Sequence, residues 1–182
     1  MSQWLGGQER LQIIDFGAAN QQNLDYVTGL GHRLYFDDLL RSFEHFFPDT
    51  ERTPEHLTAS RIEEFLASCL DFPDQSVDGA LIWDRLQFLP ASLGSAVLER
   101  LHRVLAPDAL LLALFHTDSS AVTAAPQNCR ILNQKHVQLT SAASRLPIVQ
   151  FNTRAIERYF QRFQTLKFFL TRDNLQEVLV RR

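Results

Sequence analysis

The chain has 182 residues, of which 45% are hydrophobic and 14 are Phe, so it has enough apolar side chains for a sizeable folded core. Its formal net charge of −3 argues against a dedicated nucleic-acid-binding protein, because contacts to phosphates require a basic face. The start of the chain lacks the basic and apolar segments of a signal peptide, and the longest apolar run, 109–115, is too short to cross a bilayer, so we expect no membrane span.

The beginning of the chain predicts a short β-α-β unit. The apolar run 11–16 is typical of a strand that is covered on both faces. A helix follows from Asn20, whose side chain can cap it, and ends around Gly29 and Gly31. The run 32–36 predicts a second strand.

The middle of the chain predicts two helices and another buried strand. Apolar residues at helical spacing indicate a helix over 39–47. The segment 54–58 is compatible with a brief third strand, and a capping box of Ser60 and Glu63 indicates the start of the next helix. A buried strand is then expected over 77–83.

The last part of the chain ends in an antiparallel pair of strands. An amphipathic helix over 93–105, which Pro107 ends, precedes the apolar strand 109–115. A long polar connection with room for a short hairpin follows, and then one more helix. The strands 165–170 and 175–180 are separated by four residues, so they must be antiparallel neighbours.

The alternation of strands and helices predicts an α/β fold. We expect a doubly wound, mostly parallel sheet with helices on both faces and a C-terminal antiparallel hairpin. No repeat or linker divides the chain, which indicates one domain over residues 1–182. In such a sheet, ligands bind outside the carboxyl ends of the strands, near the point where the strand order reverses.

Four segments of the sequence resemble the motifs of the class I S-adenosylmethionine-dependent methyltransferases, in the same order and at similar spacing. These are the strand and turn IIDFGAANQ at 13–21, the strand RLYFDD at 33–38, the run LDFPDQSVD at 70–78 and the helix end LHRVLAP at 101–107. The resemblance covers nearly the whole chain, from about Leu11 to Arg182, and implies a methyltransferase-like Rossmann fold. The glycine motif is degenerate.

The resemblance implies S-adenosylmethionine as the cofactor. Gly17 lets the backbone approach the cofactor closely, and Asp37 can accept two hydrogen bonds from a ribose diol, with Asp38 as the alternative acid. Ala19 and Gln21 stand where the family has two further glycines, and Ala19 remains part of the expected cofactor turn.

Other polar residues near the expected crevice have two interpretations each. Asp15 either lies near the methionine amine of the cofactor or caps the turn that follows it. Trp83 either contacts the cofactor or closes the core, and Asp84 either positions a substrate amine or favours a helix start. His116 follows a strand at the same edge, where a general base is one interpretation, although the sequence identifies no partner acid. Catalytic residues therefore stay unknown.

The cysteines and histidines are not arranged as a metal site. Cys69 and Cys129 are not spaced as CxxC, and the six histidines are scattered. We therefore expect reduced thiols, a cytoplasmic location and no bound metal.

These observations leave two functions open. The first is a methyltransferase whose acceptor, a small molecule or a protein, binds in a cleft covered by 117–150. The alternative is a non-catalytic methyltransferase-like domain that binds a protein partner, for which the aromatic segment 43–47 offers a surface. A dinucleotide-dependent oxidoreductase has less support because GxGxxG is absent.

Overall fold

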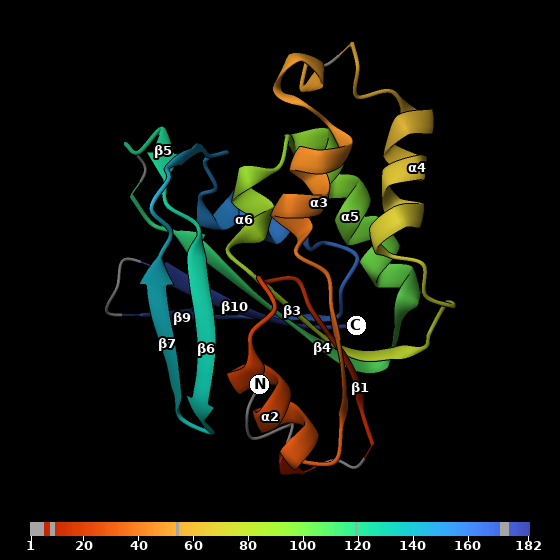
Figure 1. Ribbon diagram of the computed structural model, residues 1–182, viewed down its shortest axis with the longest axis vertical. Coiled ribbons are helices and arrows are strands. Elements are labelled where there is room, and N and C mark those ends of the chain that lie inside the picture. Colours follow the sequence, from red (N-terminus) through yellow and green to blue (C-terminus); the bar gives the residue numbers. More distant parts are fainter. Residues whose placement is uncertain (1–5, 8–9, 54, 119, 172–174) are drawn as a thin grey trace.

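A six-stranded sheet with the order β2-β1-β3-β4-β10-β9 runs through the centre of the molecule (Figure 1). The computed structural model describes residues 6–7, 10–53, 55–118, 120–171 and 175–182. The strands of this sheet are β1 (Gln12–Asp15), β2 (Arg33–Phe36), β3 (Val77–Trp83), β4 (Leu105–His116), β9 (Thr165–Leu170) and β10 (Leu175–Arg181).

The pairing of the strands confirms the predicted fold class. β1 to β4 are parallel neighbours, whereas β10 is antiparallel both to β4 and to β9. β1 lies between β2 and β3, so the chain moves outward to one side of β1 and then crosses to the other. The strand order therefore reverses at β1, and the carboxyl ends of β1, β2 and β3 border the crevice that such a reversal creates.

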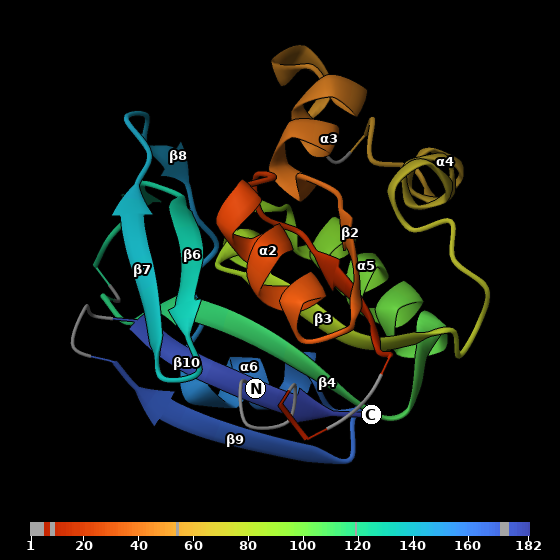
Figure 2. The same ribbon diagram turned by 60° about the horizontal axis from the view of Figure 1, so that its bottom comes forward.

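Helices cover both faces of the sheet, as expected. They are α2 (Gln21–Gly29), α3 (Leu39–Phe46), α4 (Ala59–Cys69), α5 (Ala91–Val104) and α6 (Thr153–Tyr159), with short 3₁₀ turns η1 (Asp49–Glu51) and η2 (Arg85–Phe88). The larger core lies between the sheet and α3, α4, α5 and α6, and a smaller core lies under α2. Figure 2 shows α2 in front of the sheet and α6 behind it.

The alternation of side chains along β4 explains why its sequence is a continuous apolar run. Leu111, Ala113 and Phe115 are buried in the larger core, whereas Leu112 and Leu114 belong to the smaller one. Successive side chains of a strand point to opposite faces, so a strand covered on both sides needs apolar residues throughout.

The expected hairpin in the long polar connection is present and longer than predicted. β6 (Gln127–Asn133) and β7 (His136–Ser141) form an antiparallel pair that lies beside α2, and β5 (Thr123–Ala124) pairs with β8 (Leu146–Pro147). The packing of α2 against β6 would not follow from local patterns, and it places the hairpin beside the turn after β1 (Figure 1).

Two expectations in the middle of the chain are wrong. Residue 54 lies outside the described residues, and 55–58 form a turn that leads into α4, so no strand forms over the described part of this segment. The capping residue of α4 is Thr58, whose hydroxyl accepts from Arg61 N at 3.5 Å. Ser60 already lies inside the helix and donates to the Glu64 side chain at 3.3 Å.

The boundary between α5 and β4 also differs from the prediction. The helix ends at Val104, and the strand starts at Leu105, before Pro107. Pro107 is tolerated because the register of β3 against β4 is interrupted between Val77 and Gly79, so no ladder hydrogen bond is needed from it.

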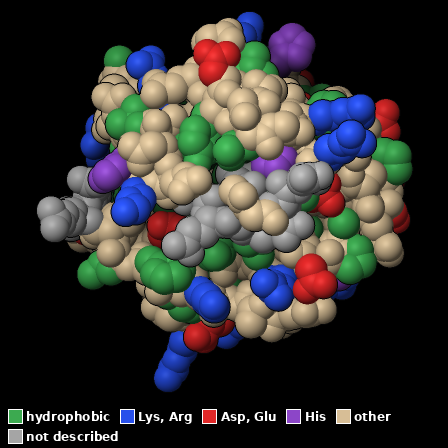
Figure 3. All heavy atoms as spheres, turned by 90° about the horizontal axis from the view of Figure 1, so that it is seen from below, with side chains coloured by type: hydrophobic (Ala, Val, Ile, Leu, Met, Phe, Trp, Pro, Cys, Tyr) green, Lys and Arg blue, Asp and Glu red, His purple; other side chains and the backbone are tan. Residues whose placement is uncertain are grey.

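The surface carries charges of both signs. On the face seen from below, Figure 3 shows Lys and Arg side chains interspersed with Asp and Glu. None of the described helices is long and apolar enough to cross a membrane.

Candidate functional site

The turn after β1 lies beside the end of β2, as the sequence predicts. Phe16 N donates to Leu81 O of β3 at 2.9 Å, and Asp37 N donates to Asp15 O at 3.0 Å. These bonds extend the parallel ladder by one residue past the strands. The turn and the first acid after β2 are therefore adjacent at the carboxyl edge of the sheet.

Asp15 is buried, and hydrogen bonds from this chain occupy both of its oxygens. Oδ1 accepts from Gly17 N at 2.9 Å and from Trp83 Nε1 at 2.6 Å, and Oδ2 accepts from Asn23 Nδ2 at 2.8 Å. Burial raises the pKa of Asp15, whereas the three hydrogen bonds act in the opposite direction. This geometry corresponds to the turn-capping interpretation of Asp15.

Gly17 is packed too tightly for any larger residue. A Cβ at this position would lie 3.1 Å from Asp15 Oδ1 and 3.1 Å from Trp83 Cδ1. Trp83 is 2% exposed, and its indole is fixed by the bond to Asp15. A side chain at this position would therefore need Trp83 or Asp15 to shift by a few tenths of an ångström.

Trp83 reaches this position through an unusual backbone conformation. Its φ is 57°, in the left-handed region, and the register of β3 against β4 shifts between Leu81 and Trp83. A bulky residue in this region costs about 1–3 kcal/mol and persists only where surrounding contacts fix it. The indole thus forms a wall between the turn and the smaller core, in line with the interpretation that Trp83 closes the core.

The two acids after β2 have different surroundings. Asp37 is half-buried, and its Oδ1 accepts from Ser42 Oγ at 2.9 Å. Burial raises the pKa of Asp37, the Ser42 hydrogen bond lowers it, and Asp38 raises it further. Asp38 is the capping residue of α3 and accepts from Arg41 N at 3.3 Å. In each of the two carboxylates, the described residues donate to Oδ1 and not to Oδ2, and Asp37 is the acid whose backbone N–H is bonded to the turn after β1.

At the two positions where the family has glycines, Ala19 has a small side chain and the side chain of Gln21 lies along α2. Ala18 and Ala19 are exposed, so their methyl groups leave the outer side of the turn open. Gln21 begins α2 and donates to Asp25 at 2.7 Å, so it lies on the helix as expected and points along it.

Asn23 connects the turn to the β6–β7 hairpin, and the sequence analysis missed it. Its Nδ2 donates to Asp15 Oδ2 at 2.8 Å and to Cys129 O at 3.1 Å, and its Oδ1 accepts from Ile131 N at 2.8 Å. A signal was present, because Asn23 lies four residues before the buried Val27 and so on the buried face of α2.

A second polar cluster fastens the other end of β6 to η2. Asp84 and Arg85 form a buried ion pair at 2.9 Å. Asp84 Oδ2 accepts from Gln127 N at 2.8 Å, and Arg85 donates to Gln127 O at 3.0 Å. Asp84 stands at the start of η2, as the helix-start interpretation expects, but its side chain makes no capping bond there. The adjacent acid and base in an otherwise apolar run were the signal for such a pair.

His116 has an acidic neighbour that the sequence did not identify. Its Nε2 lies 3.7 Å from Asp84 Oδ2, and its backbone N–H donates to Gln87 Oε1 at 2.6 Å. The side chain is 18% exposed and lines a cavity with Phe151 and Gln176. His116 therefore stands at the carboxyl edge beside a buried carboxylate.

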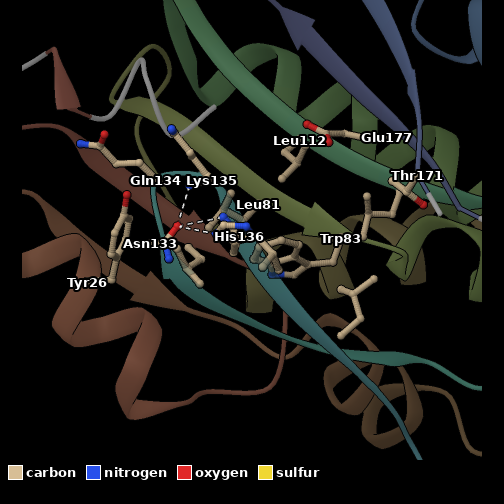
Figure 4. A pocket seen from close by; sticks show the side chains of 14 residues that line it. Tyr26, Leu81, Trp83, Leu112, Asn133, Gln134, Lys135, His136, Thr171 and Glu177 are labelled. Atoms are coloured by element: carbon tan, nitrogen blue, oxygen red, sulfur yellow. Dashed lines mark hydrogen bonds between the residues drawn. The ribbon is translucent and has the colours of Figure 1, made fainter. Parts of the chain in front are cut away.

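One cavity of about 300 Å³ lies under the hairpin, on the other side of Trp83 from the turn. Figure 4 shows Trp83 and Leu112 of the sheet facing Asn133, Lys135 and His136 at the hairpin turn. Asn133 Oδ1 accepts hydrogen bonds from the backbone N–H groups of Lys135 and His136. Neither Gly17 nor Asp37 lines this cavity.

The histidines, cysteines and acids do not come together as a metal site. Within the described ranges, no group of three or more such side chains could hold a metal ion. Cys69 and Cys129 are both buried and unpaired by disulfide. Burial raises the pKa of the Cys69 thiol to about 12, so it stays protonated.

Comparisons with known proteins agree on the fold. No sequence-family model matches the chain, and no curated protein matches it significantly. Solved structures match it over nearly its whole length. A 1,6-didemethyltoxoflavin-N1-methyltransferase from Burkholderia thailandensis, with its substrate and S-adenosylhomocysteine bound, has 16% identity and a TM-score of 0.54, covering 100% of this chain and 76% of that one.

Two archaeal proteins match over more of their own length. A methyltransferase from Methanosarcina mazei has 16% identity and a TM-score of 0.54, covering 96% of this chain and 93% of that one. A methyltransferase from Archaeoglobus fulgidus has 10% identity and a TM-score of 0.56, covering 100% of this chain and 95% of that one. Both are S-adenosylmethionine-dependent. At such identities the likeness concerns the fold alone, and the chain has a class I S-adenosylmethionine-dependent methyltransferase-like fold.

Proposed function

We propose that this protein is an S-adenosylmethionine-dependent methyltransferase. The observation that carries the proposal is the carboxylate of Asp37, which is held against the turn after β1. Its backbone N–H is bonded to Asp15 O, and the carboxylate has one oxygen that no described residue bonds. A half-buried carboxylate with a free oxygen beside a turn of small residues suits a ribose diol.

In this proposal, some residues of the turn contact the nucleoside and others hold the turn in place. Gly17, Ala18 and Ala19 supply backbone and small side chains against which a nucleoside can lie, and Asp37 accepts from the ribose hydroxyls. Asp15 and Trp83 hold the turn rigid from behind through their mutual hydrogen bond. The S-methyl group of a bound sulfonium is itself a strong electrophile, so the protein mainly has to align an acceptor with it.

The structure leaves less space for a cofactor beside Gly17 than the resemblance to the methyltransferases implies. The space next to Gly17 is taken by the indole of Trp83, so a ligand has to bind on the outer side, over Ala18 and Ala19. The β6–β7 hairpin closes the crevice on the α2 side through Asn23. The open approach is therefore from the side of α3.

Calorimetric titration with S-adenosylmethionine and S-adenosylhomocysteine tests the proposal. We expect dissociation constants of order 1–100 μM for the unaltered protein, and a loss of about tenfold or more in Asp37→Ala, since two charge-assisted hydrogen bonds disappear. Asp38→Asn is the matched control, because Asn preserves the helix cap while removing the neighbouring charge. It should bind within about twofold of the unaltered protein.

A second candidate function is a non-catalytic methyltransferase-like domain that binds a protein partner. It is favoured by the position of Trp83 against Gly17, where the indole takes up space beside the turn. Absence of heat and of thermal stabilisation at millimolar cofactor would contradict the enzyme and leave the partner-binding alternative.

A further inference from the structure

A cavity of about 360 Å³, here the His116 cavity, lies at the carboxyl end of β4. It is lined by His116 and Thr117 at the end of that strand, by residues 150–153 at the start of α6, and by Gln176 of β10. Its volume is at the lower end of the range for small-molecule sites. The described lining contains no Lys, Arg, Asp or Glu, so histidine is its one titratable residue.

His116 is held in place by the segment that directly follows β3. Its backbone N–H donates to Gln87 Oε1 at 2.6 Å. Its ring lies edge-on to Phe88, with 6.4 Å between the centroids, and its Nε2 lies 3.7 Å from Asp84 Oδ2. Since backbone, ring and ring nitrogen all face this one segment, the orientation of the imidazole is fixed.

The two ring nitrogens of His116 have different surroundings. Nε2 is buried beside the Asp84 carboxylate and has no hydrogen bond from the described residues. Nδ1 has no such bond either, yet it is not a buried atom, so it is the nitrogen that an occupant of the cavity can reach. At 3.7 Å no direct hydrogen bond joins Nε2 to Asp84, but facing lone pairs would repel each other, so the neutral ring carries its hydrogen on Nε2. Nδ1 then presents a lone pair to the cavity.

The wall opposite the histidine combines an aromatic face with a neutral amide. The ring of Phe151 is packed against Phe115 and Tyr159, with 5.2 Å and 4.9 Å between the centroids. Asn152 Oδ1 accepts from Ala155 N at 2.9 Å, so its Nδ2 is the part of the amide left for a ligand. No described wall residue can neutralise a formal charge, so the cavity matches an uncharged aromatic ligand better than an ion.

We propose that the His116 cavity binds an uncharged phenol, whose hydroxyl donates a hydrogen bond to His116 Nδ1 and whose ring lies against Phe151. β3 lies between β1 and β4, so the end of β4 is about 10 Å, two strand spacings, from the end of β1. That the phenol is the methyl acceptor rests on the proposed function, whereas its binding does not. In that reaction the hydroxyl proton passes to Nδ1, the oxygen bonds to the methyl carbon, and the sulfur keeps the electron pair of the bond that breaks.

Phenol and toluene form a matched pair of probes for this cavity. They have nearly the same shape, but a methyl group replaces the hydroxyl in toluene. At pH 8, where imidazole in water is neutral and phenol keeps its proton, we expect phenol to bind the unaltered protein about tenfold more tightly than toluene. In ¹⁵N spectra the Nδ1 signal of His116 should move upfield, as for a nitrogen that accepts a hydrogen bond, with phenol but not with toluene.

Two variants and a control locate the binding. His116→Phe keeps a ring and removes the acceptor, so the advantage of phenol over toluene should disappear. Thr153→Trp fills the cavity from the start of α6, so both probes should lose binding while thermal unfolding stays cooperative. Thr153 is exposed, so this variant keeps the test decisive if His116→Phe fails to fold. His102→Phe, in α5 and outside the lining, should leave both dissociation constants within about twofold.

Equal binding of phenol and toluene to the unaltered protein, or phenol binding that Thr153→Trp leaves intact, would overturn the proposal. So would a phenol-induced shift at Nε2 in place of Nδ1, or the lack of any binding at millimolar phenol. No cofactor is present in these titrations, so their outcome is separate from that of the cofactor titration. Phenol binding together with a silent cofactor titration would keep the ligand site and remove its role as the acceptor site.

Discussion

At the scale of single residues, the crevice is organised around the carboxylate of Asp15. Three donors converge on it, two from the following turn and helix, Gly17 and Asn23, and one from the end of β3, Trp83. A buried carboxylate is stable only with such compensation, because desolvation otherwise disfavours its charge. The turn is thereby fixed before any ligand arrives.

Replacing Gly17 with Ala tests how tightly this arrangement is packed. The added methyl group would meet Asp15 and Trp83, both of which are held by their mutual hydrogen bond and cannot yield without breaking it. We expect the free energy of unfolding to fall by about 1–3 kcal/mol in a denaturant titration.

Gly29→Ala is the control for that measurement. A Cβ there has nothing within 4 Å, and Gly29 is the last residue of α2. Its stability should stay within about 0.5 kcal/mol of the unaltered protein or rise slightly. Equal effects of the two substitutions would show that packing around the turn does not determine the result.

At the scale of elements, the β6–β7 hairpin is fastened by polar side chains more than by a shared strand ladder. It forms its own two-stranded sheet and is joined to α2 through Asn23 and to η2 through Asp84 and Arg85. Isolated two-stranded hairpins are marginally stable in water, so these anchors matter for its position.

Asn23→Leu should loosen this hairpin selectively. The substitution preserves the size of the buried side chain but leaves Cys129 O and Ile131 N without their partner. We expect a loss of about 2–4 kcal/mol in the free energy of unfolding, and faster hydrogen exchange at Ile131 N than at the amides of β10. Asn128→Ala, an exposed position on the same strand, should leave both quantities unchanged.

How far the elements could be predicted depends on how local their causes are. β3 was predicted over 77–83 because a strand buried on both faces is an uninterrupted apolar run. The segment 54–58 was mistaken for a strand because its few apolar residues carry no periodicity. The bond between Asn23 and Cys129 spans 106 residues, and no local pattern indicates it.

The candidate site, too, could be predicted from the sequence only where its arrangement has local causes. The adjacency of Gly17 and Asp37 follows from the parallel order of two short strands, which local patterns predict. The buried pair of Asp84 and Arg85 depends on the hairpin, because both side chains bond Gln127, at separations of 43 and 42 residues along the chain.

At the scale of the whole molecule, the crevice acids make stability depend on pH. The folded-state pKa of Asp37 is raised, chiefly by burial. A raised carboxyl pKa favours the folded state below the unfolded pKa, near 3.8, and this contribution is lost as the pH rises through the folded value. At neutral pH the charged Asp37 therefore opposes folding.

Asp37→Asn should accordingly stabilise the protein at pH 7. The amide retains the acceptor for Ser42 and carries no charge to desolvate. The gain in the free energy of unfolding should shrink as the pH is lowered toward 3.8, which unfolding titrations between pH 4 and pH 7 measure. A gain that does not change with pH would show that desolvation of the charge is not its cause. A gain in stability combined with weaker cofactor binding would indicate a residue kept for function at a cost to the fold.

The two anchors of the hairpin limit the chemistry that this edge of the sheet can perform. Besides Asp37, the charged side chains of Asp15, Asp84 and Arg85 lie at this edge, and all three are bound to backbone or to each other. Groups so fixed are poor proton carriers, since moving a proton would release the segment that they hold. A protein built this way is suited to reactions in which the reagent brings its own leaving group and the polypeptide provides alignment.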